Sequence, residues 1–172
     1  MKNIKVISGV LYYITRFTAI LYFLVILYAL VSLTTQWSYI TFDNGNYFSI
    51  CYPFSETPFL NGENSWSYKI FNFIIPISFY SVFFYLISNV FKVFKQPKLF
   101  TDYNVKQLQC FSFTNIFIPL LIILLAKMFT ETIEEGSGYV TVIHFFIGIF
   151  SYFLSEIFKQ GLHLQNEQDL YI

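Results

Sequence analysis

Residues 70–91, Ile-Phe-Asn-Phe-Ile-Ile-Pro-Ile-Ser-Phe-Tyr-Ser-Val-Phe-Phe-Tyr-Leu-Ile-Ser-Asn-Val-Phe, contain no Lys, Arg, Asp or Glu. As an α-helix this stretch is about 33 Å long, which matches the ~30 Å hydrocarbon core of a bilayer. Its fourteen Ile, Leu, Val and Phe residues contribute about −4 to −8 kcal/mol to the free energy of membrane insertion. The stretch therefore predicts a transmembrane helix.

Three further stretches have the same character, residues 17–33, 108–126 and 136–155. A helix with one face in water would carry polar residues every three or four positions, and we find no such stripes. We therefore predict an all-α fold, a four-helix transmembrane bundle with spans at about 14–35, 70–94, 105–127 and 139–158. Because the chain has 172 residues, 56% hydrophobic and 12% charged, residues 1–172 are expected to form a single membrane domain.

The basic residues divide unevenly between the two sides of this topology. Only Lys69 and Lys127 fall on one side. The other side holds Lys2, Lys5, Arg16, Lys92, Lys95, Lys98, Lys106 and Lys159. By the positive-inside rule, both termini are expected to be cytoplasmic. The first span is interpreted as an uncleaved anchor, since its apolar run is too long for a usual signal peptide and lacks a small-x-small cleavage site.

The longest outer segment, residues 36–69, connects the first two spans. Its residues 37–42 and 47–52 favour strands and flank Asp43-Asn44-Gly45-Asn46, which predicts a small β-hairpin. A second turn is expected at Asn61-Gly62-Glu63-Asn64, before the chain re-enters the membrane.

Two spans share an Asn-x-x-x-Pro pattern, Asn72 to Pro76 and Asn115 to Pro119. Each proline frees the carbonyl group of the asparagine four residues earlier. In lipid that carbonyl needs a partner, so we expect kinks lined by a neighbouring helix, a hydroxyl group or water. One interpretation is helix packing, with the asparagines bonding across helices. The other is a broken-helix substrate or ion site, which needs additional polar lining that the pattern does not supply.

His144 is the ionisable residue that lies deepest in a predicted span. It is expected to be a neutral imidazole bonded to a neighbouring hydroxyl or carbonyl group, with proton sensing as the alternative. Asn72, Asn115 and His144 are therefore the candidate intramembrane polar contacts. His163 falls on the opposite side of the bilayer, so the two histidines cannot share a metal.

Other reactive residues give no catalytic pattern. Glu131, Glu134 and Glu135 are expected on a solvated helical continuation of the third span, with outward cation capture as the alternative. Cys51 and Cys110 are predicted to lie a membrane thickness apart, which excludes a disulfide. We find no metal-binding spacing, nucleophile motif or phosphate loop, so we predict no catalytic residue, no metal, no cofactor and no enzyme activity.

Two short segments resemble one another, Phe94-Lys95-Gln96-Pro97 after the second span and Phe158-Lys159-Gln160-Gly161 after the fourth. Pro97 and Gly161 are both expected to end helices. The similarity favours two related hairpins, although chance remains an equal explanation in a chain rich in Phe and Lys. The basic residues nearby are expected to face anionic lipid or a cytoplasmic partner rather than nucleic acid. They are Lys92, Lys95, Lys98, Lys106 and Lys159.

The same region resembles the bacterial domain-of-unknown-function family 2975, whose members are four-span membrane proteins with an aromatic outer loop. Residues 93–108 read Val-Phe-Lys-Gln-Pro-Lys-Leu-Phe-Thr-Asp-Tyr-Asn-Val-Lys-Gln-Leu, and residues 156–170 read Glu-Ile-Phe-Lys-Gln-Gly-Leu-His-Leu-Gln-Asn-Glu-Gln-Asp-Leu. The first segment fits the family pattern at Phe94, Lys95, Pro97, Phe100, Asn104 and Leu108. The second fits at Phe158, Lys159, Gly161, Leu164, Gln165, Glu167 and Leu170. Tyr171 departs from the pattern, where Thr is expected.

The resemblance implies a regulatory partner, because members of this family look like products of genes adjacent to a small helix-turn-helix regulator. It leads to the hypothesis of an integral protein of the bacterial cytoplasmic (inner) membrane, a sensor or tether whose cytoplasmic face binds that regulator. The alternative is a small transporter or channel subunit that uses the proline-containing spans. The sequence does not indicate an oligomeric state.

Overall fold

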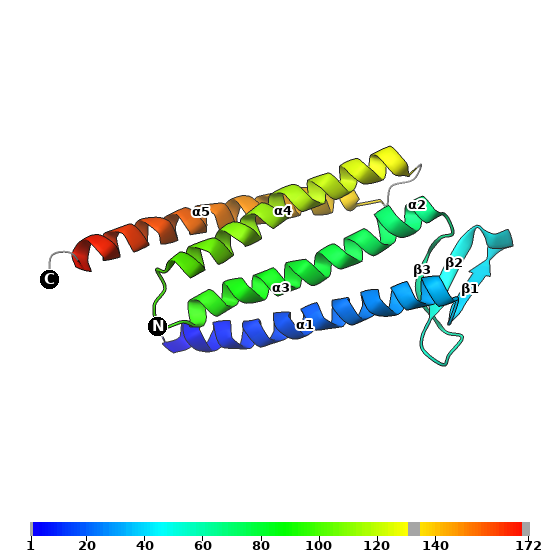
Figure 1. Ribbon diagram of the computed structural model, residues 1–172, viewed down its shortest axis with the longest axis horizontal. Coiled ribbons are helices and arrows are strands. Elements are labelled where there is room, and N and C mark those ends of the chain that lie inside the picture. The colour runs from blue at the N-terminus through cyan, green and yellow to red at the C-terminus, as the bar shows by residue number, and fades with distance from the viewer. Residues whose placement is uncertain (1, 131–134, 170–172) are drawn as a thin grey trace.

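The computed structural model describes residues 2–130 and 135–169. Long helices lie side by side, and a small sheet covers one end of the bundle (Figure 1). The long helices are α1 (Lys2–Thr35), a continuous second helix covering Trp66–Lys95, α4 (Asp102–Phe129) and α5 (Ser137–Asp169). All four of these helices are long and apolar enough to cross a membrane. α1 begins and α5 ends at the end opposite to the sheet (Figure 1).

Two helices extend well beyond their predicted spans. α1 begins at Lys2 rather than near residue 14, and α5 continues to Asp169 rather than ending near residue 158. The prediction located the uncharged core of each span. A helix continues past that core because long charged side chains reach the aqueous boundary while their stems stay on the apolar surface.

Gly161 was predicted to end a helix, and this prediction is wrong. The residue lies inside α5, where a Cβ atom would come within 2.6 Å of a ring carbon of Phe100. Glycine is therefore required for the close approach of the aromatic ring, and no left-handed turn is formed there.

The second helix contains one irregular segment. α2 (Trp66–Tyr68) leads into the π-helical η2 (Lys69–Ile74), which leads into α3 (Ile75–Lys95). The N–H group of Ile75 bonds to the carbonyl oxygen of Ile70, five residues earlier. Pro76 follows directly, and it lacks the N–H group that a regular turn needs. Pro119, in contrast, lies inside α4, which is continuous from Asp102 to Phe129.

Polar and small side chains are directed into the bundle. α5 carries a stripe of such residues with alternating spacings of three and four, and every one of them is buried. The stripe consists of Thr141, His144, Gly148, Ser151 and Ser155. The expectation that polar stripes are missing is therefore wrong for α5, because its stripe faces other helices instead of water.

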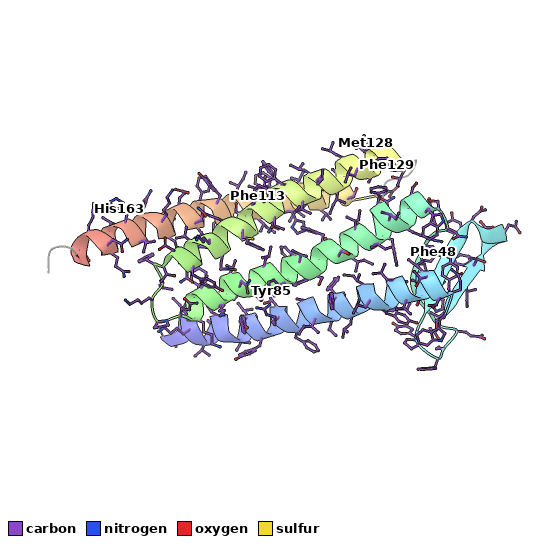
Figure 2. The ribbon with its side chains drawn as sticks, viewed as in Figure 1. Phe48, Tyr85, Phe113, Met128, Phe129 and His163 are labelled. Atoms are coloured by element: carbon purple, nitrogen blue, oxygen red, sulfur yellow. The ribbon has the colours of Figure 1, made fainter. Side chains whose placement is uncertain are left out.

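The outer surface of the bundle is apolar. Phe150 of α5 is 66% exposed, and Phe113 of α4, labelled in Figure 2, is 60% exposed. Inward polar groups and outward phenylalanines are the arrangement expected when hydrocarbon is the solvent.

α4 and α5 are in close contact at Gly148. The Ser112 hydroxyl donates a hydrogen bond to the Gly148 carbonyl oxygen over 2.8 Å. A Cβ atom on Gly148 would lie 2.5 Å from Cγ1 of Ile116 and 3.0 Å from the Ser112 carbonyl oxygen. Small residues at such crossings permit the close backbone contact that stabilises helix pairs in membranes.

The sheet has three antiparallel strands in the order β1-β2-β3. Its strands are β1 (Tyr39–Phe42), β2 (Tyr47–Cys51) and β3 (Pro58–Glu63), and the 3₁₀ turn η1 (Asp43–Gly45) joins the first two. The expected β-hairpin is thus present as β1 and β2. The all-α description omits the sheet, which buries Phe48 and Ile50 against Ala29, Leu33 and Phe73.

The turn expected at residues 61–64 is wrong for its first three residues. Asn61, Gly62 and Glu63 belong to β3 and pair with Ser49, Phe48 and Tyr47 of β2. Gly62 is accommodated there because its missing side chain leaves room for the rings of Phe48 and Tyr68. The local turn signal was overridden by pairing with a neighbouring strand.

We expect Gly148→Ala to destabilise the protein by about 1–3 kcal/mol, because the added methyl group meets backbone atoms that cannot move aside. Gly138→Ala is the matched control, since a Cβ atom at Gly138 meets nothing within 4 Å. That control is expected to be neutral or slightly stabilising, since alanine favours helix formation. Thermal unfolding of the full-length protein in detergent measures both effects. Equal stability of the two variants would contradict the close helix crossing.

Candidate functional site

A cavity of about 310 Å³ lies between η2–α3, α4 and α5. Pro76 and Pro119 both line it, and so do Asn72 and His144. The remaining lining residues are Phe71, Phe79, Tyr80, Ile122, Ile123, Ala126, Glu135, Gly136, Ser137, Val140 and Thr141. The structure therefore brings the two Asn-x-x-x-Pro segments and His144 to one place.

Asn115 and His144 form a buried polar pair between α4 and α5. Nδ1 of His144 lies 2.8 Å from Oδ1 of Asn115. His144 is 5% exposed and Asn115 is fully buried. The partner of His144 is thus a carbonyl oxygen, as predicted, and it belongs to the side-chain amide of Asn115, which makes the predicted bond across helices.

The hydrogen bonds of Asn115 determine which nitrogen of His144 carries a proton. Nδ2 of Asn115 donates to the Phe111 carbonyl oxygen over 2.7 Å, which identifies the other amide atom as Oδ1. Because Oδ1 is an acceptor only, Nδ1 of His144 is the donor. In the neutral ring, Nε2 then keeps its lone pair. With Nδ1 bonded to Asn115, Nε2 is the ring nitrogen of this cavity-lining residue that is left to accept a hydrogen bond.

Aromatic rings enclose the imidazole of His144 on the side of α3. The ring centroids of Phe79 and Phe83 lie 4.9 Å and 5.0 Å from the imidazole centroid, both nearly perpendicular to it, and that of Tyr80 lies 5.9 Å away. Phe83 also contacts Phe111 of α4. This layer of rings separates the cavity from the opposite end of the bundle.

The cavity reaches the loop between α4 and α5. Thr141, one helical turn from His144, donates through Oγ1 to the Ser137 carbonyl oxygen over 2.9 Å. Glu135 is exposed at this side of the cavity. α4 ends at Phe129 and Thr130 is already extended, so the expected helical continuation of the third span is wrong at that point. Glu131 and Glu134 lie outside the described residues.

Five predicted site lysines gather at the opposite end of the molecule, which we call the lysine-bearing end. These residues, all exposed, are Lys92, Lys95, Lys98, Lys106 and Lys159. Lys95 Nζ lies 4.7 Å from the ring centroid of Tyr13 in α1, and Lys159 lies 3.9 Å from the Glu156 carboxylate. His163 is on the same side of the molecule, as Figure 2 shows, far from Met128 and Phe129 at the end of α4.

The two similar segments of the sequence meet at the lysine-bearing end. Phe158 contacts Phe94 and Phe100 edge-to-face, with centroid distances of 5.7 Å and 5.4 Å. Thr101 caps α4 by accepting a bond from the Asn104 N–H group, while Nδ2 of Asn104 donates to the Leu99 carbonyl oxygen over 2.8 Å. The loop between α3 and α4 is thereby fixed against α5.

A groove follows α5 beside this loop. Its volume is about 510 Å³, and Phe100, Gly161, Leu164 and Gln165 are among its lining residues. All four belong to the segments on which the family resemblance was based. Some of the residues shared with the family pattern, such as Phe94, Asn104 and Phe158, therefore hold this end together, and others face one groove.

A family model described as "Protein of unknown function (DUF2975)" matches residues 55–172. The chain belongs to the DUF2975 family. No curated protein and no solved structure matches the chain significantly.

The DUF2975 match begins after β2, so it contains the cavity and the lysine-bearing end but not α1. α1 nevertheless packs along α3 (Figure 1). Nη2 of Arg16 donates to Oδ1 of Asn89 over 2.9 Å, and its guanidinium group lies 4.2 Å from the ring centroid of Tyr85. The Ser81 hydroxyl donates to the Ala19 carbonyl oxygen over 3.2 Å.

Lys69 is a buried residue that the sequence analysis placed only in the outer segment. Its Nζ donates to the Tyr39 hydroxyl over 2.9 Å and to Oδ1 of Asn64 over 2.6 Å. Nζ also lies 5.2 Å from the ring centroids of Phe48 and Trp66. These contacts attach the sheet to the second helix. Of these partners, Asn64 and Trp66 lie near Lys69 in the sequence, five and three residues earlier.

Groups that bind metal ions do not gather within the described ranges, 2–130 and 135–169: no three His, Cys, Asp or Glu side chains come together there. Cys51 is buried in the sheet and Cys110 is exposed on α4.

Three cavity residues were not predicted from the sequence, namely Tyr80, Thr141 and Glu135. Thr141 could have been associated with His144 by its spacing of three, which places both on one helix face.

We expect Asn115→Leu to destabilise the protein by about 1–3 kcal/mol, since it leaves the buried Nδ1–H group of His144 without its acceptor. His144→Phe combined with Asn115→Leu is expected to recover part of that loss, with a coupling free energy of about 0.5–2 kcal/mol. A double-mutant cycle measured by reversible unfolding in detergent tests the pair. Strictly additive effects of the two substitutions would contradict it.

Proposed function

We propose that the protein is a non-enzymatic integral protein of the bacterial inner membrane, a sensor or tether that holds a small helix-turn-helix regulator at its lysine-bearing end. The observation that carries this proposal is the groove beside α5. It is built by residues from both segments of the family pattern, and it follows α5 from Ile157 to Gln168, almost to the end of the helix at Asp169.

The lining of the groove suits an amphipathic helix of a partner. Phe100, Gly161 and Leu164 offer apolar contact, and Gln160, Gln165 and Gln168 offer hydrogen bonds. A helix laid in an apolar groove with polar edges is a common mode of peptide recognition. Leu164 is 61% exposed, so a partner would remove a substantial apolar area from water.

The exposed lysines provide the attachment to the membrane surface. Each Lys near anionic headgroups contributes about 1 kcal/mol. Lys92, Lys95, Lys98 and Lys106 lie near helix ends, where the bilayer surface is expected. We infer that lipid headgroups bind these lysines while the groove stays available to the regulator.

The sensor or tether hypothesis is favoured over a transporter by the ring layer below the cavity. Phe79, Phe83 and Phe111 fill the bundle between the cavity and the lysine-bearing end. A conduction path would require these rings to separate.

We expect Leu164→Glu to reduce co-purification of the proposed helix-turn-helix regulator by at least about tenfold, since a charge would have to be buried at the interface. His163→Gln is the matched control, because His163 is exposed on the same turn of α5 but does not line the groove. Pull-down of the full-length protein from solubilised membranes, quantified by immunoblot, measures the effect. Equal recovery with both variants would remove the groove from the proposal.

We expect a cysteine at Glu56 to react with a membrane-impermeant maleimide in intact cells, and a cysteine at Asn166 to react only after lysis. Both residues are exposed; Glu56 lies between β2 and β3, and Asn166 lies near the end of α5, which is opposite to the sheet (Figure 1). Cys51→Ser and Cys110→Ala remove the native thiols from the background. Labelling of the Asn166 position in intact cells would reverse the proposed orientation.

A further inference from the structure

The proposed function makes no use of the cavity next to His144, although the cavity combines a defined acceptor with an apolar wall. His144 is almost completely buried, and its Nδ1 atom is held by Asn115. The remaining nitrogen, Nε2, is an acceptor in the neutral ring. An acceptor beside an apolar wall is stabilised by a donor, so a molecule in the cavity that carries an O–H group would supply a partner for Nε2.

The lining of the cavity is mostly apolar, so the rest of that molecule is expected to be apolar as well. Phe71, Phe79 and Tyr80 contribute aromatic surface, and Pro76 and Pro119 contribute two rigid rings. The volume of about 310 Å³ lies at the lower end of the range for small-molecule sites. A ring with a short hydrocarbon chain has the corresponding size.

The charges around the cavity argue against an anionic ligand. None of its described lining residues is Lys or Arg, and the Glu135 carboxylate lies on its loop side. A carboxylate or phosphate ligand would be desolvated without a cationic partner, at a high free-energy cost. A metal ion is also disfavoured, because His144 lies in no cluster of three metal-binding side chains among the described residues.

We propose that this cavity binds an uncharged apolar molecule through one hydroxyl group, which donates a hydrogen bond to Nε2 of His144. Asn115 is a positioning residue in this site, since its amide holds the imidazole in the tautomer that accepts the bond. The site depends on the cavity alone and does not rest on the proposed partner at the lysine-bearing end.

The test uses the full-length protein with ¹⁵N-labelled histidine in phosphatidylcholine nanodiscs. The chain contains two histidines, so His163 serves as an internal reference at the other end of α5. The probes are 4-octylphenol and its methyl ether, 4-octylanisole, which keeps the apolar body but has no O–H group. We expect the phenol to move the Nε2 resonance of His144 upfield without changing that of His163, and the ether to move neither.

Variants distinguish binding of the phenol through a hydrogen bond from binding of its hydrocarbon part alone. His144→Asn keeps an amide N–H group near the position of Nδ1, so it can still bond to Asn115, but it lacks Nε2. We expect this variant to lose the preference for the phenol over the ether, which should be about tenfold in the wild-type protein. Ligand-dependent thermal stabilisation measures that preference. His163→Asn is the matched control and should retain it.

A second variant keeps the proposal testable if His144→Asn does not fold. Val140→Trp adds bulk to the lining of the cavity and keeps the His144 imidazole as the reporter, and it should abolish the response of that reporter to the phenol. Nanodiscs with and without dioleoylglycerol identify the source of the hydroxyl group. A shift with dioleoylglycerol indicates a membrane lipid, and a shift with the phenol alone indicates a free small molecule.

Two results would overturn the proposal. Equal shifts of His144 with the phenol and the ether would mean that the cavity accepts hydrocarbon without a hydrogen bond. An unchanged His144 resonance at saturating phenol would mean that no hydroxyl group reaches Nε2.

Discussion

Hydrocarbon provides no hydrogen-bond partners, and the placement of polar side chains in this protein follows from that constraint. Backbone groups are satisfied within long helices, and side chains such as Ser88, Ser112 and Ser155 bond to backbone carbonyl groups inside the bundle. Phenylalanines such as Phe113 and Phe150, a residue type that would be buried in a soluble bundle, lie on the outer surface. The buried pair of Asn115 and His144 follows the same constraint, because each satisfies the other where water is excluded.

The sequence was sufficient to identify four helices that are long and apolar enough to cross a membrane, because the length of such uncharged runs is set by the thickness of the membrane. It was insufficient for the ends of the helices. The role of Gly161 depends on the ring of Phe100, about sixty residues away in the chain, and no local pattern contains that contact. Asn61 likewise reads as a turn residue until its pairing with Ser49 is known.

For the cavity, too, the sequence identified single residues but not how they come together. Asn72, Asn115 and His144 were identifiable individually as polar residues within apolar runs. Their meeting depends on the rotation of three helices about their axes, which a uniformly apolar surface does not reveal. The stripe on α5 was a usable signal, because its spacing identifies the face that packs against other helices. Lys69 was not identifiable, since its ring contacts come from β1 and β2 as well as from Trp66.

The uninterrupted course of α5 through Gly161 has a geometric consequence. The close crossing at Gly148 can serve as a pivot, and the helix continues from there for about 32 Å to Asp169, at 1.5 Å per residue. A tilt of about 5° at the crossing would displace the far end by about 3 Å, in the manner of a lever. His144 lies about one turn from Gly148, on the other side of the crossing. A change in the space around His144 therefore acts on the shorter part of α5, between Ser137 and Gly148.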